Sequence, residues 1–126
     1  MKINIKGTNF KITPEVTNYL EKRIIGIEKF LPKDERAFVI DVELGKTTEH
    51  HHAGDIFKAE ININFEGQTF RAVSIMPDLY SAIDDMKTEI NRELGSFKEK
   101  KISLLRRGGQ RIKNLLRGLY KKSGGK

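Results

Sequence analysis

The chain has 126 residues, a length typical of one domain, and combines 37% apolar with 33% charged residues at a formal net charge of +7. It contains no cysteine, which excludes disulfides, a thiol nucleophile and thiolate-bound zinc or iron–sulfur clusters. No apolar run reaches the roughly 18 residues of a membrane span, and the N-terminus lacks the apolar segment of a signal peptide, so we expect a cytoplasmic protein with no membrane partner.

The first third of the chain predicts a strand, a helix and a second strand. Apolar and polar residues alternate over 2–6, which is typical of a strand. Thr13 and Pro14 form a helix start, with a capping hydroxyl before a proline at the first helical position, and Pro32 ends the helix. Alternation resumes over 37–44. The helix carries one apolar stripe with spacings of three and four residues, formed by Val16, Leu20, Ile24, Ile27 and Leu31.

Two further strands and a second helix follow. Residues 45–55 form a polar loop, and residues 56–65 alternate most clearly. The sequence Glu66-Gly67-Gln68 indicates a hairpin turn to a returning strand over 69–75, because glycine adopts backbone angles that other residues resist. Asp78 is the cap of the second helix. The apolar stripe of that helix consists of Leu79, Ile83, Met86, Ile90, Leu94 and Phe97.

This order predicts an α+β fold, β-α-β-β-β-α. The first helix is a crossover that makes strands one and two parallel, and the short loops make the other neighbours antiparallel. Each strand has one apolar face, so we expect a four-stranded mixed sheet with both helices packed on one face. We assign residues 1–101 to this domain and residues 102–126 to a basic tail that is partly helical or disordered. Gly108-Gly109 interrupts the tail, which leaves at most a short helix over about 110–121.

The charge is unevenly distributed along the chain. Residues 1–85 contain eleven Lys or Arg against fourteen Asp or Glu, and residues 86–126 contain thirteen against three. From Lys100 onward there are ten basic residues and no acid. A solvated tail that only aids solubility is the alternative, but solubility favours added Asp and Glu over added Lys and Arg. The distribution therefore predicts a polyanionic partner.

Basic residues on both helices extend this surface. At 100° per residue, Lys22 and Lys29 lie about 20° apart, opposite the apolar stripe of the first helix. On the second helix, Lys87, Asn91 and Lys98 share one flank within about 40°. The tyrosines are too scattered for a base-stacking platform, so contact with phosphates and recognition of shape are the expected mode. The candidate RNA-binding residues are Lys22, Arg23, Lys29, Lys87, Asn91, Arg92, Lys98, Lys100, Lys101, Arg106, Arg107, Arg111, Lys113 and Arg117.

No group of residues indicates an enzyme. Adjacent histidines in an extended chain, such as His50-His51-His52, point to alternate faces, and no cysteine completes a tetrahedral site, so we expect no metal. Asp84 and Asp85 point about 100° apart on a helix and do not form a carboxylate pair. Gly108-Gly109 lacks the spacing of a phosphate-binding loop. We therefore expect no catalytic activity, no cofactor and no small-molecule substrate.

Four short stretches resemble one known family. They are Ile3-Asn4-Ile5-Lys6-Gly7, Phe57-Lys58-Ala59-Glu60-Ile61, Asp78-Leu79-Tyr80-Ser81-Ala82-Ile83-Asp84 and Ile90-Asn91-Arg92-Glu93-Leu94. The third is close to the Asp-Met-Tyr-Ala-Ala-Ile-Asp motif of the bacterial ribosome hibernation factors, the family of ribosome-associated inhibitor A and hibernation-promoting factor. The resemblance covers about residues 1–100, and the tail is similar to the short basic extensions of the short family members.

The resemblance implies a ribosome-binding domain. Such a protein binds the small ribosomal subunit across the tRNA and mRNA sites of the decoding centre, contacts 16S rRNA phosphates, and inhibits translation in idle ribosomes. Ribosomal proteins near the decoding centre are the other partners that it implies. Glu89 and Gly95-Ser96 depart from the family, in which basic residues are usual there. By position, the basic residues that face RNA in the family correspond to Lys22, Arg23, Lys29 and Arg92.

A general double-stranded RNA-binding module, not dedicated to the ribosome, is the alternative function. Such a module needs a lysine-rich start to its last helix, and Asp78, Asp84 and Asp85 stand there instead. A third hypothesis is a partner- or membrane-binding tail. The tail has Tyr120 as its one aromatic residue, so anchoring to a membrane would be weak.

Overall fold

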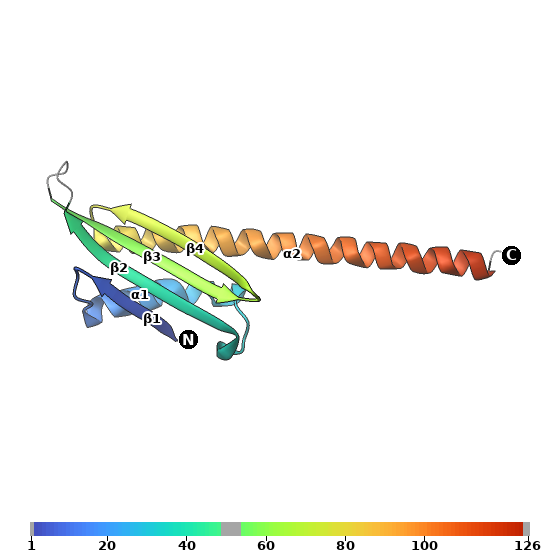
Figure 1. Ribbon diagram of the computed structural model, residues 1–126, viewed down its shortest axis with the longest axis horizontal. Coiled ribbons are helices and arrows are strands. Elements are labelled where there is room, and N and C mark those ends of the chain that lie inside the picture. The colour runs from blue at the N-terminus through green and yellow to red at the C-terminus, as the bar shows by residue number, and fades with distance from the viewer. Residues whose placement is uncertain (1, 49–53, 125–126) are drawn as a thin grey trace. The chain divides into compact units, whose positions relative to one another are not determined.

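The structure is a computed structural model that describes residues 2–48 and 54–124, with the side chains of residues 48 and 110–124 left out of the description. Its elements in chain order are β1 (Ile3–Thr8), α1 (Pro14–Ile24), the 3₁₀ helices η1 (Ile25–Phe30) and η2 (Glu35–Ala37), β2 (Phe38–Thr48), β3 (Asp55–Phe65), β4 (Gln68–Met76) and α2 (Leu79–Gly124) (Figure 1). The chain divides into an N-terminal unit, Met1–Leu94, and a C-terminal unit, Gly95–Lys126. The order β-α-β-β-β-α is the predicted one.

The four strands form one mixed sheet in the order β1-β2-β3-β4. β1 pairs with β2 in parallel, and the other neighbours are antiparallel. The turn between β3 and β4 consists of Glu66 and Gly67, whose φ angles of 53° and 71° are both left-handed. Two left-handed residues match the twist of the flanking strands, and glycine adopts this angle without steric cost. The predicted sheet and hairpin are confirmed, but the predicted loop over 45–55 is too long, because β2 continues to Thr48 and β3 begins at Asp55.

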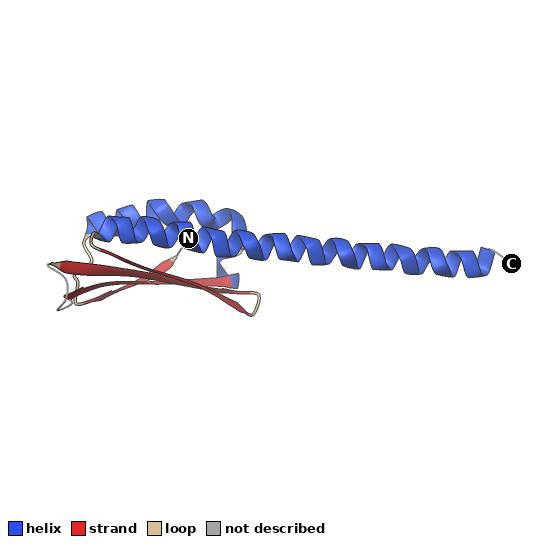
Figure 2. Cartoon of the chain, turned by 90° about the horizontal axis from the view of Figure 1, so that it is seen from above, coloured by secondary structure: helices blue, strands red, loops and turns tan. Residues whose placement is uncertain are grey.

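One face of the sheet is covered by α1 and the beginning of α2 (Figure 2). Alternate residues of β2 and β3 are buried beneath these helices, from Ile40 to Leu44 and from Ala59 to Phe65. The helices bury Val16, Leu20, Ile24, Leu79, Ile83, Met86, Ile90 and Leu94 against them. Each buried Leu or Ile side chain stabilises the fold by about 1.5–3 kcal/mol. The predicted apolar stripes are therefore the core of the N-terminal unit, except that Phe97 is half-buried and belongs to the C-terminal unit.

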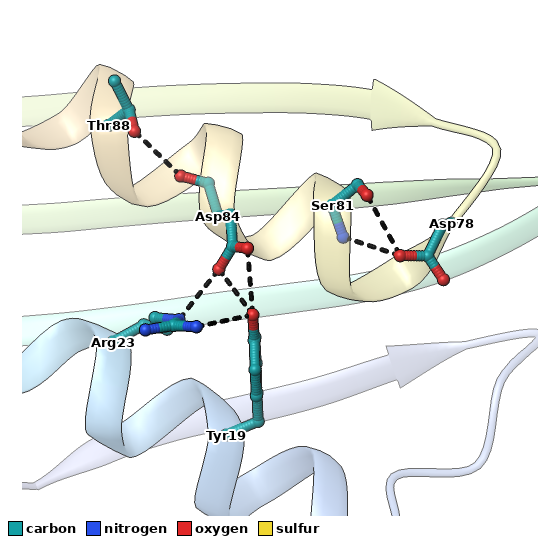
Figure 3. Close-up of polar contacts among 6 residues, drawn as sticks. All are labelled: Tyr19, Arg23, Asp78, Ser81, Asp84 and Thr88. Atoms are coloured by element: carbon teal, nitrogen blue, oxygen red, sulfur yellow. Dashed lines mark hydrogen bonds and ion pairs between the residues drawn. The ribbon is translucent and has the colours of Figure 1, made fainter.

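Both helices begin where the sequence predicts. The Thr13 hydroxyl accepts a hydrogen bond from the Val16 backbone N–H at 3.2 Å, and Pro14 is the first helical residue. Asp78 Oδ2 accepts hydrogen bonds from the backbone N–H and the hydroxyl of Ser81, both at 3.0 Å (Figure 3). Each cap satisfies an N–H that has no partner inside the helix.

The first α-helix is shorter than its apolar stripe predicts. α1 ends at Ile24, and η1 carries the chain onward as a 3₁₀ helix. Gly26 and the neighbouring β-branched isoleucines are weak α-helix formers, which favours the tighter turn near a helix end. A 3₁₀ helix advances by about 120° per residue. The predicted angle of about 20° between Lys22 and Lys29 is therefore wrong, although Ile27 remains buried.

The last helix is longer than predicted. α2 continues past Gly108 and Gly109 to Gly124, so the predicted interruption is wrong. Each glycine costs an α-helix about 1 kcal/mol relative to alanine. A helix already started upstream nevertheless gains one hydrogen bond per residue, and the surrounding Lys, Arg, Leu and Gln favour helix. Within the described ranges, none of the helices has the length and apolar character needed to cross a membrane.

Candidate nucleic-acid interface

The two helices on the sheet run side by side in the same direction, because β1 and β4, which precede them, point the same way (Figures 1 and 2). Along the line where they meet, three pairs of residues face each other: Tyr19 with Tyr80, Arg23 with Asp84, and Gly26 with Lys87. The pairs advance by four and then by three residues on both sides. This matched step is what two parallel helices in a fixed register produce. We call this line the interhelical seam.

Arg23, Asp84 and Tyr19 form the middle of the interhelical seam (Figure 3). Arg23 Nε lies 2.9 Å from Asp84 Oδ1, and Arg23 Nη2 donates to the Tyr19 hydroxyl at 2.9 Å. The Tyr19 hydroxyl in turn donates to Asp84 Oδ1 at 2.8 Å. The hydrogen bond to Tyr19, and after it the carboxylate of Asp84, raises the pKa of Arg23 above its ordinary value. The guanidinium is thus permanently charged and held by both neighbours.

Lys87 lies over the next position of the seam, Gly26, and two further lysines precede and follow this glycine in the sequence. Lys87 Nζ lies 3.9 Å from the place that a Cβ of Gly26 would occupy, so the absent side chain leaves room for the ammonium group. Lys22 precedes Gly26 by four residues, on α1, and Lys29 follows it by three residues, within η1, so each lies one helical turn from Gly26 along the chain. We call Lys22, Lys29 and Lys87 the lysine cluster.

The lysine cluster keeps its positive charge available. Within the described part of the chain, none of the three ammonium groups has a carboxylate partner. Lys29 Nζ lies 5.1 Å from the centre of the Phe30 ring, a contact that leaves its hydrogen-bond donors open. Lys22 and Lys29 are exposed, and Lys87 is half-buried. An unpaired ammonium group is a suitable partner for a phosphate oxygen.

Arg92 and Asn91, also predicted to bind RNA, are less available. Arg92 Nη1 donates to both carboxylate oxygens of Glu89, at 2.9 and 3.2 Å. This carboxylate partly neutralises the guanidinium that would otherwise meet a phosphate. Asn91 is half-buried, and its Oδ1 is buried with no hydrogen-bond partner among the described residues. The structure therefore pairs Arg92 with a carboxylate and leaves Asn91 half-buried.

The remaining predicted residues belong to the C-terminal unit, which is described by itself. Its described basic side chains are all exposed: Lys98, Lys100, Lys101, Arg106 and Arg107. Leu104 and Leu105 are 64% and 67% exposed beside them. The side chains of Arg111, Lys113 and Arg117 lie outside the description. This unit is thus an exposed basic helix whose described leucines join no core.

The sheet face turned away from the helices is electrically balanced. Its charged residues alternate with the core residues of the strands, and they are Lys6, Lys58 and Arg71 against Asp41, Glu43 and Glu60. Each of these carboxylates accepts a hydrogen bond from a neighbouring strand, as Glu60 does from Arg71 Nε at 2.6 Å. This face offers a polyanion no excess charge, which favours the helical side as the nucleic-acid interface.

Sequence reasoning missed Tyr19 and Asp84 as parts of the site. The spacing of Tyr19 and Arg23, four residues apart on one helix, was a usable signal for a pair. Asp84 belongs to another element, and only the folded register brings it to them. For metals, no cluster of three or more His, Asp or Glu fit for an ion is found among the described residues. The histidines of His50-His51-His52 lie outside that description.

Comparison with known proteins identifies relatives of this domain. A model of the family described as Sigma 54 modulation protein / S30EA ribosomal protein matches residues 3–102. A ribosome hibernation promotion factor from Picosynechococcus sp. is 30% identical over 100 residues, which are 79% of this chain and 50% of that protein. A ribosome hibernation promoting factor from Klebsiella oxytoca is 25% identical over 100 residues, 79% of this chain and 96% of that protein. The chain thus spans half of the first relative and nearly all of the second.

Among solved structures, the N-terminal domain of Protein Y from Thermus thermophilus has a TM-score of 0.63 at 26% identity. The match covers 77% of this chain and 99% of that domain. The stretch that matches the family model, residues 3–102, contains the whole sheet, the interhelical seam and the lysine cluster.

Proposed function

The chain belongs to the Sigma 54 modulation protein / S30EA ribosomal protein family, and from this premise we propose that it binds the small ribosomal subunit and keeps idle ribosomes inactive. The names of the two relatives described above, both ribosome hibernation factors, support this function. The proposed contact is with the phosphates of 16S rRNA, with ribosomal proteins near the decoding centre as further partners.

The lysine cluster is the observation that carries the proposal. It places three ammonium groups without carboxylate partners, among the described residues, on the helical side of a domain whose opposite face is balanced in charge. A phosphate backbone is the extended anionic partner that suits such a surface, because it is recognised by charge and shape. The C-terminal unit adds eleven Lys or Arg against one acid, which attracts a polyanion over a longer distance.

We propose the decoding centre as the docking position. This step depends on the likeness of residues 78–84 and 90–94 to the hibernation-factor motifs, and on the acid-free sequence from Lys100 onward. The folded domain would dock by its helical side across the tRNA sites, and the tail would extend along the adjacent mRNA path. Occupying both would inhibit translation without any chemical reaction.

Co-sedimentation with ribosomes at a series of salt concentrations tests binding. If about six to eight basic residues reach phosphates, the logarithm of the binding constant should fall with the logarithm of salt by roughly 0.7 to 0.9 per contact. Lys22→Gln should lower this slope by about one contact. Lys58→Gln, which removes a lysine from the opposite sheet face, is the matched control and should leave the slope unchanged.

Hydroxyl-radical footprinting of 16S rRNA tests the position. Protection at the decoding centre supports the proposal, and protection elsewhere on the subunit contradicts it. Competition with an unrelated RNA duplex distinguishes the general double-stranded RNA-binding alternative, because a module of that kind would be displaced from ribosomes by equal amounts of duplex. Affinity that does not change between low and moderate salt would exclude the phosphate mechanism.

A further inference from the structure

Arg23 stands in the interface by sequence position, but two of its three side-chain nitrogens are engaged by neighbouring side chains, and the group remains 47% exposed. Its Nε and Nη2 are taken by Asp84 and by the Tyr19 hydroxyl, each at 2.9 Å (Figure 3). The guanidinium also lies over the Tyr19 ring, with its carbon 4.6 Å from the ring centre. A phosphate could bind Arg23 through these donors only by displacing a carboxylate and a hydroxyl that already satisfy them.

The network of Arg23, Tyr19 and Asp84 connects two separate elements. Tyr19 and Arg23 belong to α1, and Asp84 belongs to α2. One step further along the same seam, Lys87 of α2 lies over Gly26 of η1. Lys87 follows Asp84 by three residues, and Gly26 follows Arg23 by three. A slip of one helix along the other would therefore break the network and move Lys87 away from Gly26 together.

We propose that Tyr19, Arg23 and Asp84 are positioning residues that hold the two helices in the register at which the lysine cluster is assembled. Arg23 in this role does not contact a phosphate. Lys87 comes from α2, whereas Lys22 and Lys29 come from α1 and η1, so the cluster exists only in one register. The inference about RNA contact rests on the proposed function, whereas the inference about register does not.

Tyr19→Phe is the most specific variant, because it changes no charge and keeps the aromatic ring, whose centre lies 4.6 Å from the centre of the Tyr80 ring. It removes the hydroxyl that bridges Arg23 and Asp84. If Arg23 were a phosphate contact, the variant would free its Nη2 and binding would stay equal or tighten. If the network sets the register, a fraction of the molecules loses the assembled cluster. Ribosome affinity then falls by about fivefold, and its dependence on salt stays the same.

The matched control is Tyr80→Phe. The Tyr80 hydroxyl makes no hydrogen bond within the described part of the chain, so its removal should change neither affinity nor register. Lys22→Gln is the reference for a lost phosphate contact and should reduce the salt slope, which Tyr19→Phe should not. Arg23→Lys keeps the charge, but a single ammonium group cannot reach both Asp84 and the Tyr19 hydroxyl as the planar guanidinium does. This variant should behave like Tyr19→Phe.

A measurement without ribosomes reads the register directly. In the nuclear Overhauser spectrum of the free protein, the cross-peak between the Lys87 ε-protons and the Gly26 α-protons reports their proximity. We expect this cross-peak in the wild type and in Tyr80→Phe. In Tyr19→Phe and Arg23→Lys it should weaken or disappear, while the circular dichroism spectrum stays unchanged. A full cross-peak in both seam variants would overturn the proposal, whatever the ribosome experiment shows.

The charge-swapped pair completes the test. Arg23→Asp combined with Asp84→Arg restores an ion pair across the seam with opposite polarity. Recovery of the cross-peak and of ribosome affinity relative to each single variant supports positioning. Recovery of the cross-peak without recovery of affinity shows that the guanidinium is needed at position 23, and overturns the statement that Arg23 does not contact RNA. Failure of the wild type to sediment with ribosomes would reject the proposed function alone.

Discussion

The N-terminal and C-terminal units of this chain differ in both packing and charge. The N-terminal unit contains thirteen Lys or Arg against sixteen Asp or Glu, and the C-terminal unit contains eleven against one. Among the described residues, every large side chain that is fully buried belongs to the N-terminal unit. The difference teaches that the two properties are separate along the chain. The N-terminal unit has a fixed surface that can recognise a shape, and the C-terminal unit has the excess positive charge that can attract a polyanion.

A folded unit with more acids than bases is not drawn to RNA by its net charge. Binding of such a unit to a polyanion has to depend on the positions of a few cationic side chains. The lysine cluster and the interhelical seam beside it are therefore the features that we propose to test. The C-terminal unit has the reverse properties. Its net positive charge favours a polyanion at a distance, but no described core fixes its side chains. We therefore expect position to come from one unit and long-range attraction from the other.

Reversing Lys22 and Lys29 to Glu is the change with the largest expected effect. If both lysines make the proposed phosphate contacts, each substitution replaces an attraction with a repulsion, and ribosome affinity should fall by about a thousandfold at 0.1 M salt. Deleting residues 103–126 should lower affinity less, because those contacts are not held in one geometry. The deletion should relieve more of the inhibition of mRNA placement. Sedimentation measures the first property and a translation-initiation assay the second. Equal proportional losses in both would show that the tail is only additional phosphate-binding surface.

A pair of leucine substitutions compares the packing of the two units. Leu20 is 0% exposed in the N-terminal core, and Leu105 is 67% exposed in the C-terminal unit. Leu20→Ala should lower the free energy of unfolding by about 2–5 kcal/mol, whereas Leu105→Ala should change it by no more than about 0.5 kcal/mol. Urea unfolding followed by circular dichroism measures both. A loss above about 1 kcal/mol from Leu105→Ala would show that the C-terminal helix packs on a core.

The fold of the N-terminal unit was predictable because its signals are local. Alternation in the strands, the caps at Thr13 and Asp78, and the glycine of the Glu66-Gly67 turn each act within a few residues. Two predictions failed for a related reason. The change from α to 3₁₀ geometry after Ile24 and the continuation of α2 past Gly108 are decided by small differences in propensity. Such differences are too small to be read from apolar spacing alone.

The candidate site was predictable only in part. Lys22, Lys29 and Lys87 were found as basic residues, but the approach of Lys87 to Gly26 depends on the register between two helices. The role of Arg23 was predicted as RNA contact, whereas in the structure its Nε and Nη2 are engaged by Asp84 and Tyr19. A sequence shows that a guanidinium is present. The sequence does not show that a carboxylate of α2, about sixty residues further along the chain, pairs with this guanidinium.

Truncation after Lys101 tests whether the two units are independent in stability. The apolar stripes of both helices and all four strands precede this residue. The shortened protein should keep a cooperative thermal transition, with a midpoint within about 2 °C of the full chain, since a shift of several degrees corresponds to about 1 kcal/mol in a domain of this size. Differential scanning calorimetry measures it. A broad transition without a clear midpoint would mean that Leu104 or Leu105 contributes to the fold.

Titration of Asp34 is the smallest effect and is confined to the N-terminal unit. Asp34 Oδ1 accepts hydrogen bonds from the Arg36 backbone N–H at 3.0 Å and from Arg36 Nε at 3.2 Å, and these bonds lower the pKa of Asp34 below its ordinary value. Because the folded pKa is the lower one, the contribution to stability is complete above the unfolded pKa of about 3.9. It is lost as the pH falls through the folded pKa.

Side-chain NMR between pH 5 and pH 2 should therefore give Asp34 a titration midpoint below that of an unfolded aspartate. In the variant Asp34→Asn, the small part of the acid-induced loss of stability that comes from Asp34 should be absent. The backbone amides of residues 106–118 are the internal control, because they lie at least seven residues from Glu99 and from the terminal carboxylate of Lys126. Their shifts should stay constant over the same range. A midpoint at or above the ordinary value would contradict the bond to Arg36. Shifts in residues 106–118 that follow the titration of Asp34 would show that the charges of the two units are coupled, since this stretch has no carboxylate of its own.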